Sequence, residues 1–162
     1  IASMEGTRAI LVELQALVAP SHFSTSSRRS TGVDQNRLAL LLAVLEKKVG
    51  FHLAQMDIFV SITGGIKIVE PAADLAILLA IASSFTNQVL PKDMAVVGEV
   101  GLSGECRSVP WVENRIKEAM NMGFSKIMLP QRSLKGLKER FNQKIELVGV
   151  SSVAEAIKIA IG

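Results

Sequence analysis

Residues 64–84 read GGIKIVEPAADLAILLAIASS, which is typical of a turn that presents a nucleophile at the start of a helix. Two glycines and a short apolar run lead to Glu70 and Pro71, and a long apolar stretch follows. A serine or cysteine at such a turn attacks a carbonyl carbon once a neighbouring base activates it. Here the turn carries Ala72 and Ala73, whose methyl groups cannot attack. The sequence therefore predicts the shape of a catalytic turn without its nucleophile.

Other common catalytic and metal-binding patterns are missing from the sequence. There is no GxxxxGK[ST] phosphate-binding loop and no GxSxG nucleophile turn. Cys106 is the single cysteine, so no internal disulfide or cysteine-rich zinc site can form, which fits a reducing compartment. We interpret it as a small side chain on a hairpin strand. His22 and His52 lack ligand-like spacing, so we expect no metal site.

The composition favours one domain with an aliphatic core. The chain has 162 residues, of which 49% are hydrophobic and 4% aromatic, and this length suits a single domain over residues 1–162. No apolar run reaches the roughly 18 residues of a membrane span, so we expect no membrane association. The first residues, IASMEGTR, show neither a signal-peptide layout nor an initiator Met, and we expect an excised domain.

Hydrophobic periodicity predicts an α/β fold (α+β, with a mixed sheet). We expect strands over residues 8–18, 57–63, 66–69, 95–100, 105–109, 126–129 and 145–150, the fourth and fifth forming a hairpin. Helices are expected over residues 36–49, 71–84, 110–122, 132–141 and 153–161. Asp34 has the position of a helix N-cap, Gly50 and Gly123 those of helix stops, and residues 20–31 read as a polar loop.

Five segments of the chain, taken in order, resemble the C-terminal domain of the RadA/Sms family of bacterial DNA repair and recombination ATPases. They are EGTRAILVELQALV, GVDQNRLALLLAVLEKKVG, DIFVSITGGIKIVEPAADLAILLAIASS, VVGEVGLSGECRSV and NRIKEAMNMGFSKIMLP. The resemblance implies a Lon-like fold, which is that of the Lon protease proteolytic domain and of ribosomal protein S5 domain 2. The N-terminal domain of the magnesium-chelatase-like ComM group has a similar GEVGLSGE hairpin, but the opening segment fits RadA better.

The likeness to Lon implies which positions a peptidase would use. Lon proteases carry a Pro-Ser-Ala-Gly element, which reads Pro71-Ala72-Ala73-Asp74 here, so that Ala72 stands at the nucleophile's place. The activating Lys corresponds to Arg115 when counted from Pro110, and to Glu113 when counted back from Gly123. An arginine stays protonated and cannot act as the neutral base, and a glutamate has no nucleophile to serve. We therefore predict no peptidase activity and no enzyme in this domain.

The resemblance also implies what the intact protein does. Such a protein has a zinc finger, a RecA-like ATPase domain and this Lon-like domain, and it forms a ring that drives branch migration in recombination. ATP, Mg²⁺ and Zn²⁺ are then expected in the missing N-terminal domains and none in this one. The Lon-like domain would serve as the scaffold of a hexamer and as a DNA-binding surface, with a RecA-type recombinase as a further partner. The expected compartment is the bacterial cytoplasm, or a plastid or mitochondrion for a plant protein.

Basic residues point to sequence-independent binding of duplex or branched DNA. The formal charge is +3, and residues 124–144 hold six basic side chains against Glu139. The candidates for phosphate contact are Arg28, Arg29, Arg37, Arg115, Lys117 and Lys126. Arg28 and Arg29 are favoured because they lie in the predicted loop, whereas Arg37 and Arg115 could equally form ion pairs within the protein. The scarcity of aromatic residues disfavours base stacking on a single strand.

Two other functions stay open at this point. The domain could be an oligomerisation scaffold without DNA contact, its basic patches merely solvated. It could also be a Lon-type peptidase that uses a displaced serine, such as Ser61, Ser103 or Ser108. The sequence places no Lys or His to activate any of the three, so this second alternative is disfavoured.

Overall fold

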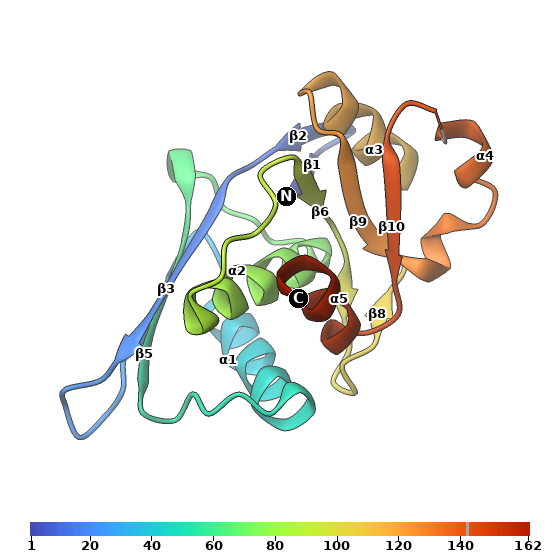
Figure 1. Cartoon of the computed structure of the whole chain (residues 1–162). Helices are drawn as coiled ribbons and strands as arrows, with labels where there is room; N and C mark the ends of the chain where they lie inside the picture. The colour runs from blue at the N-terminus through green and yellow to red at the C-terminus, as the bar shows by residue number, and fades with distance from the viewer. Residues whose placement is uncertain (142) are drawn as a thin grey trace.

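The computed structural model describes residues 1–141 and 143–162, and in these residues two three-stranded β-sheets organise the chain (Figure 1). The first sheet has the order β3-β5-β4, with β3 (Leu14–Pro20) antiparallel and β4 (Arg28–Thr31) parallel to the central β5 (Met56–Ile62). It lies at the left of Figure 1. The mixed pairing agrees with the predicted α/β fold with a mixed sheet, although the strands are divided between two sheets.

The second sheet is wholly parallel and comes from the second half of the chain. Its order is β10-β9-β6, with β9 (Lys126–Pro130) between β10 (Glu146–Val150) and β6 (Met94–Val96). Two short antiparallel hairpins complete the described strands: β1 (Ala2–Glu5) with β2 (Arg8–Leu11), and β7 (Glu99–Val100) with β8 (Cys106–Arg107).

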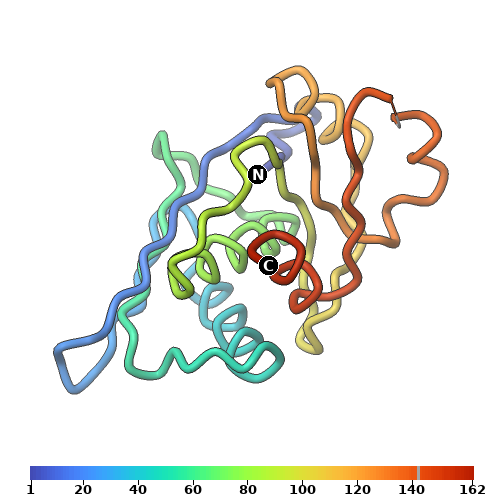
Figure 2. Tube along the Cα trace, viewed as in Figure 1, coloured from blue at the N-terminus to red at the C-terminus, as the bar shows by residue number. Residues whose placement is uncertain are grey.

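The helices fill the space between the sheets and cover the second one. They are α1 (Gln35–Val44), which continues into a π-helical turn (Leu45–Val49), α2 (Asp74–Thr86), α3 (Val112–Asn121), α4 (Lys138–Phe141) and α5 (Val153–Ile161). Short 3₁₀ turns occur at Thr63–Gly65, Pro71–Ala73 and Gln131–Leu134. Figure 2 shows that the chain between β9 and β10 loops away from the second sheet on the right of the view.

Helix α2 is the centre of the core. It packs against β3 and α5, and its side chains are buried without interruption from Asp74 to Leu79. Its sequence, DLAILLAIASSFT, is apolar almost all round, as expected for a helix enclosed on every side. One core cluster gathers around α1, α2 and β5, and a second gathers around α3, β9 and the turn at Gln131–Leu134.

Several predicted elements are confirmed, with their local causes. The Asp34 carboxylate accepts a hydrogen bond from the backbone N–H of Arg37 at 2.9 Å and caps α1 as predicted. Gly50 ends the same helical run in the left-handed conformation, with φ of 88°. The helices predicted over residues 71–84, 110–122 and 153–161 correspond to α2, α3 and α5, and the hairpin around residues 101–104 is β7–β8.

Other predictions were wrong at particular places. The strand predicted over residues 8–18 is divided into β2 and β3, which belong to different sheets. Residues 66–69 form no strand, apart from a single bridge between Ile68 and Val33. The helix predicted over residues 132–141 is broken, because Lys135 is extended (ψ 117°) and Gly136 has a φ of 78°. Only its last turn, α4, is α-helical.

The predicted polar loop over residues 20–31 ends in strand β4, which carries Arg28 and Arg29. Its sequence, RRST, has no apolar alternation that would reveal a strand. It is held by parallel pairing with β5, where Arg28 lies opposite Ile58 and Arg29 opposite Phe59. The two arginines are therefore fixed on a sheet rather than carried by a flexible loop.

A pair of glycine substitutions tests how tightly the chain packs after β4. Gly32 and Gly50 both have positive φ, at 84° and 88°, so alanine is strained at either position. A Cβ at Gly32 would also lie 2.5 Å from the carbonyl oxygen of Ile66 and 2.8 Å from the Ile62 side chain, whereas a Cβ at Gly50 meets nothing within 4 Å. We expect Gly32→Ala to lower the free energy of unfolding by about 3 kcal/mol and Gly50→Ala by about 1 kcal/mol, measured by urea denaturation. Equal losses would contradict the close approach at Gly32.

Candidate functional site: the Pro71 turn and the basic surface

The Pro71 turn is closed to any substrate at the position of the missing nucleophile. Residues Pro71–Ala73 form one 3₁₀ turn that leads into α2, with Pro71 at the first helical position, where its missing N–H costs nothing. Ala72 and Ala73 are both 3% exposed. The carbonyl of Ala72 accepts a hydrogen bond from the N–H of Gly98 at 2.8 Å, which ties the chain before β7 to the turn. The methyl group of Ala72 thus belongs to the core.

The Arg115 guanidinium lies beside the turn and is fully buried. Its Nη1 is 2.7 Å from Oε1 of Glu70 and its Nη2 is 2.8 Å from Oε2, which makes a bidentate ion pair. Its Nε donates to the carbonyl of Pro110 at 2.9 Å, and Nη1 also donates to the carbonyl of Ala2 at 2.8 Å. Every nitrogen of the guanidinium therefore has a partner within the protein.

Glu70 accepts further hydrogen bonds from the first hairpin. The Ser3 hydroxyl and the Met4 N–H both donate to its Oε1 at 2.9 Å. Burial by itself raises the pKa of Glu70, but the hydrogen bonds from Arg115, Met4 and Ser3 and the charge of Arg115 outweigh it, so that the pKa lies below the ordinary 4.5. Glu70 is therefore ionised at neutral pH.

A second ion pair closes the other side of the turn. The Asp74 carboxylate, 1% exposed, accepts from Nε of Arg37 at 2.8 Å and from Nη2 of the same arginine. It also accepts from the N–H of Val100 at 3.0 Å, while Arg37 donates to the Val100 carbonyl at 3.3 Å. The hydrogen bond from Arg37 to Asp74 raises the pKa of Arg37 further, so its charge is fixed. A cavity of about 350 Å³ lies between the two pairs, lined by Arg37, Glu70 and Asp74 among others.

Of the two positions considered for the lost Lys, the structure places Arg115 at the turn. Glu113 instead faces Arg140, whose Nη1 is 2.5 Å from its Oε1. The turn thus joins a buried alanine to a permanently charged arginine that is already paired. At this turn Ala72 has no nucleophilic atom and Arg115 is already paired with Glu70, which differs from a nucleophile held beside a neutral base.

The serines considered as displaced nucleophiles also have no activating base bound to them in the described part of the chain. Ser61, Ser103 and Ser108 are exposed, and among the described residues none is hydrogen-bonded to a lysine or histidine. Cys106 is buried in the hairpin, as predicted for a small side chain, and burial together with the charges of Glu155 and Glu105 raises its pKa to about 12. Its thiol stays protonated and unreactive at neutral pH.

Two of the six residues predicted to contact DNA, Arg37 and Arg115, are paired inside the protein instead. Arg115 is inaccessible to any ligand, because it is fully buried against Glu70. Arg37 is held by the buried Asp74, so it is not free to follow a phosphate backbone. For both residues the alternative of an internal ion pair is the one that the structure shows.

The four other candidates lie at the surface on three different elements. Arg28 is half-buried, donates to the Leu53 carbonyl at 3.0 Å and lies 3.8 Å from Glu46. Arg29 is exposed on β4, and Lys117 is exposed on α3. Lys126, on β9, lies 4.0 Å from Glu146. The structure does not bring these four side chains together in one cluster.

Strand pairing reveals polar neighbours of Arg29 that the sequence did not indicate. Thr31 on β4 lies opposite Ser61 on β5, which lies opposite Gln15 on β3, and all three are exposed. The exposed side chains of Arg29 and Phe59 stand in the next row of the same sheet. We call this outward surface of β3, β5 and β4 the outer face of the first sheet. Alternation along β5 could have indicated it, but only once the register with β4 was known.

The described part of the chain has neither a metal-ligand cluster nor a helix that could span a membrane. No group of three or more His, Cys, Asp or Glu residues is arranged to hold a metal ion there. In the same residues no helix has both the length and the apolar character needed to cross a membrane.

Comparison with known proteins gives two consistent findings. Residues 42–162 match the family described as the Lon protease (S16) C-terminal proteolytic domain. The whole chain is 46% identical to a DNA repair protein RadA of Halalkalibacterium halodurans, and 99% of it is 47% identical to that of Bacillus subtilis. The protein of the same name from Chlamydia pneumoniae is 49% identical over 96% of the chain. The chain spans 34–35% of the length of these relatives.

The Glu70–Arg115 pair is tested by breaking it from one side. Glu70→Gln leaves the Arg115 cation buried without its counter-charge, and we expect it to lower the free energy of unfolding by about 3–5 kcal/mol. Glu70→Gln/Arg115→Met removes both charges and should regain most of this loss, because an apolar side chain tolerates the buried position. Urea denaturation at pH 7 measures both. A double variant no more stable than the single one would contradict a buried charge pair.

The same pair makes stability depend on acid. Because the pKa of Glu70 is lower in the folded than in the unfolded protein, its contribution is complete above about pH 4.5 and is lost as the pH falls through the folded pKa. We expect the wild type to lose more stability between pH 6 and pH 3 than Glu70→Gln/Arg115→Met, in urea titrations at fixed ionic strength. Parallel pH profiles would show that Glu70 contributes nothing.

Proposed function

Because the chain belongs to the family of Lon protease (S16) C-terminal proteolytic domains, we propose that it is a member without peptidase activity that serves as a scaffold and a duplex DNA-binding surface. Its similarity over the full length to DNA repair proteins named RadA makes it a domain of the RadA type. In the longer protein it would support branch migration during recombination. The fully buried Arg115, paired with Glu70 beside Ala72, is the observation that carries the loss of peptidase activity.

The outer face of the first sheet supports the assignment of DNA binding. Arg29 projects from it opposite Phe59, and the adjoining row of the same face holds the hydroxyl groups of Thr31 and Ser61 and, on β3, the amide of Gln15. Arginine and hydroxyl side chains are frequent donors to phosphate oxygens, and contacts of this kind carry no sequence information. Arg28 pairs with the buried Ile58 and so points to the opposite side of the sheet, and Lys117 and Lys126 lie on other elements; these three would add only to the general positive field.

Further parts of the proposal concern the longer protein. We propose that this domain helps to assemble a hexameric ring and that a RecA-type recombinase is a partner of the whole protein. We propose that ATP, Mg²⁺ and Zn²⁺ bind to other domains of the longer protein. We place the protein in the bacterial cytoplasm, or in a plastid or mitochondrion for a plant protein.

The loss of peptidase activity is tested by restoring the nucleophile. We expect Ala72→Ser to hydrolyse neither unfolded casein nor short fluorogenic peptides above the wild-type background, because its hydroxyl would face a protonated arginine instead of a neutral base. The wild type and the variants Ser61→Ala, Ser103→Ala and Ser108→Ala provide the controls. Turnover by the wild type that one serine substitution abolishes would overturn the assignment.

DNA binding is tested first at Arg29, whose substitution removes no hydrogen bond found in the structure. Arg29→Ala should weaken binding of a 20-base-pair duplex by about tenfold, equally for unrelated sequences, and should lower the slope of log affinity against log salt by about one. Fluorescence anisotropy between 50 and 200 mM salt measures both quantities. Arg28→Ala should add to the effect, although it also removes the bond to Leu53.

The matched control for this experiment is Lys158→Ala, on the exposed part of α5. It should leave both the affinity and the salt slope unchanged. Light scattering on the same samples reports assembly. A multimer that ignores the duplex at 50 mM salt would favour an oligomerisation scaffold without DNA contact.

A further inference from the structure

Strand β10 is an open edge of the second sheet. Its neighbour on one side is β9, and no other described strand pairs with it (Figure 1). The N–H of Glu146 donates to the carbonyl of Ser125 at 2.9 Å, toward the β9 side. Backbone groups of successive residues in a parallel strand alternate between its two sides. The N–H and C=O of Leu147 and Gly149 therefore point outward from the sheet.

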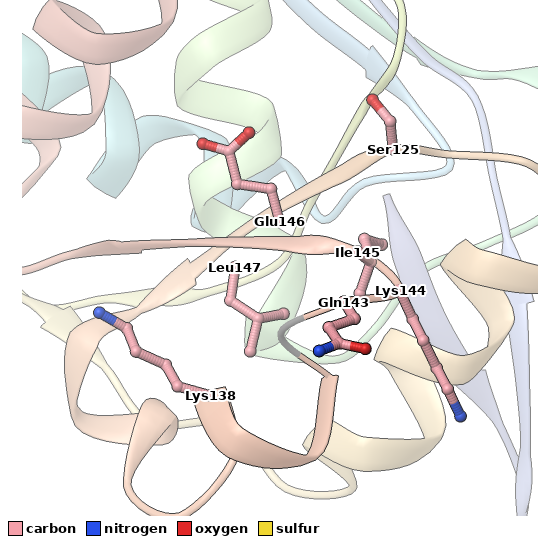
Figure 3. Close-up of a pocket in the computed structure, with 7 residues that line it drawn as sticks. All are labelled: Ser125, Lys138, Gln143, Lys144, Ile145, Glu146 and Leu147. Carbon is pink, nitrogen blue, oxygen red and sulfur yellow. The ribbon is translucent and has the colours of Figure 1, made fainter.

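A groove runs along the first half of this edge. It encloses a volume of about 430 Å³ and is lined by Ser125, residues 145–147 of β10 and its approach, and the side chains of Lys138, Gln143 and Lys144. Figure 3 shows Lys138 and Leu147 on one side of the strand, with Lys144 at its beginning and Glu146 turned to the opposite side. We call this feature the β10 groove. It combines the open backbone edge of β10 with flanking cations.

The surroundings of the groove are strongly basic. Arg132, Lys135, Lys138 and Lys144 are exposed, and a second cavity of about 530 Å³ continues past Arg132, Lys135 and Lys138. The acids nearby are Glu139, in that second cavity, Glu146, which lines the groove and lies 4.0 Å from Lys126, and Asp93, which accepts a hydrogen bond from the Ser125 hydroxyl. Arg140 is paired with Glu113 and is not counted among these cations. The groove therefore offers its backbone edge within a surplus of positive charge.

The two free edges of the first sheet are less available. On β3, the N–H of Val18 already donates a hydrogen bond to the Ser84 hydroxyl of α2 at 2.9 Å. The chain beyond β4 turns to bridge Val33 to Ile68. Strand β3 also carries no charged side chain, so nothing on it selects a partner by charge. The β10 edge has both open backbone and a charge preference.

We propose that the β10 groove binds an extended acidic segment of a partner protein, which adds to the second sheet as a fourth strand. An extended peptide supplies both donors and acceptors to the outward groups of Leu147 and Gly149, and acidic side chains at alternate positions would meet Lys138 and Lys144. A nucleic acid satisfies this edge less well, because a phosphodiester accepts hydrogen bonds but has no donor for the free carbonyls. A duplex also presents a convex surface, which matches the outer face of the first sheet better than the β10 groove.

The proposal is tested with a synthetic peptide, acetyl-EVEVEVEV-amide, and the whole chain. Isothermal titration calorimetry should detect binding to the wild type, and the lysine counterpart acetyl-KVKVKVKV-amide should not bind. Lys138→Glu/Lys144→Glu should weaken binding by about tenfold or more. The matched control, Lys47→Glu/Lys67→Glu, makes the same change of charge at two exposed lysines in the first half of the chain, neither of which lines the groove, and should bind as the wild type does. Circular dichroism establishes that both variants are folded.

Two further measurements separate strand addition from simple charge attraction. An EVEVEVEV peptide methylated on every backbone nitrogen should lose binding, because it cannot donate to the strand edge in any orientation. In the bound state the Leu147 and Gly149 amides should exchange more slowly with solvent, by NMR. Equal binding of the methylated peptide, or unchanged affinity for Lys138→Glu/Lys144→Glu, would overturn the proposal. So would a 20-base-pair duplex that displaces the peptide and shifts the same amides, since the groove would then be a nucleic-acid surface.

Discussion

The fully buried guanidinium of Arg115 is the constraint on which the arrangement around the Pro71 turn depends. An unpaired charge at such a position would cost several kcal/mol, so its surroundings must supply acceptors in fixed places. They come from three separate parts of the chain: the Glu70 carboxylate, the Ala2 carbonyl on β1 and the Pro110 carbonyl before α3. The first hairpin, the turn before α2 and the start of α3 are thereby held in register by one side chain.

The Arg37–Asp74 pair repeats this arrangement on the other side of the same turn. It joins α1 to the start of α2 and to Val100 of β7, again through a nearly inaccessible carboxylate. Between them the two pairs fix both ends of Pro71–Ala73. A turn that in a peptidase must leave room for a nucleophile, a base and a substrate is here a structural junction. The two ion pairs that hold the turn also engage the guanidinium groups of Arg37 and Arg115 on either side of it.

Local signals in the sequence were sufficient where a structure depends on neighbouring residues. Asp34 could be assigned as an N-cap and residues 71–84 as a helix because capping and helical periodicity act within a few positions. The role of Arg115 could not be derived in this way, since Glu70 lies 45 positions away and their meeting depends on the whole fold. Strand β4 was missed for a related reason. Its polar sequence carries no periodic signal, and its pairing with β5 is what makes it a strand.

The positive charge that is available to a partner can be judged only after the two internally paired arginines are excluded. Arg37 and Arg115 neutralise internal carboxylates, so the two proposals rest on other cations, which belong to two separate places. One is the outer face of the first sheet with Arg29, and the other is the β10 groove with Lys138 and Lys144. These lie on different sheets, at the left and right of Figure 1, with α2 and the core between them. Because neither surface shares a residue with the other, the two proposals together predict that a duplex on the first sheet and a peptide strand on the second would not compete for the same residues.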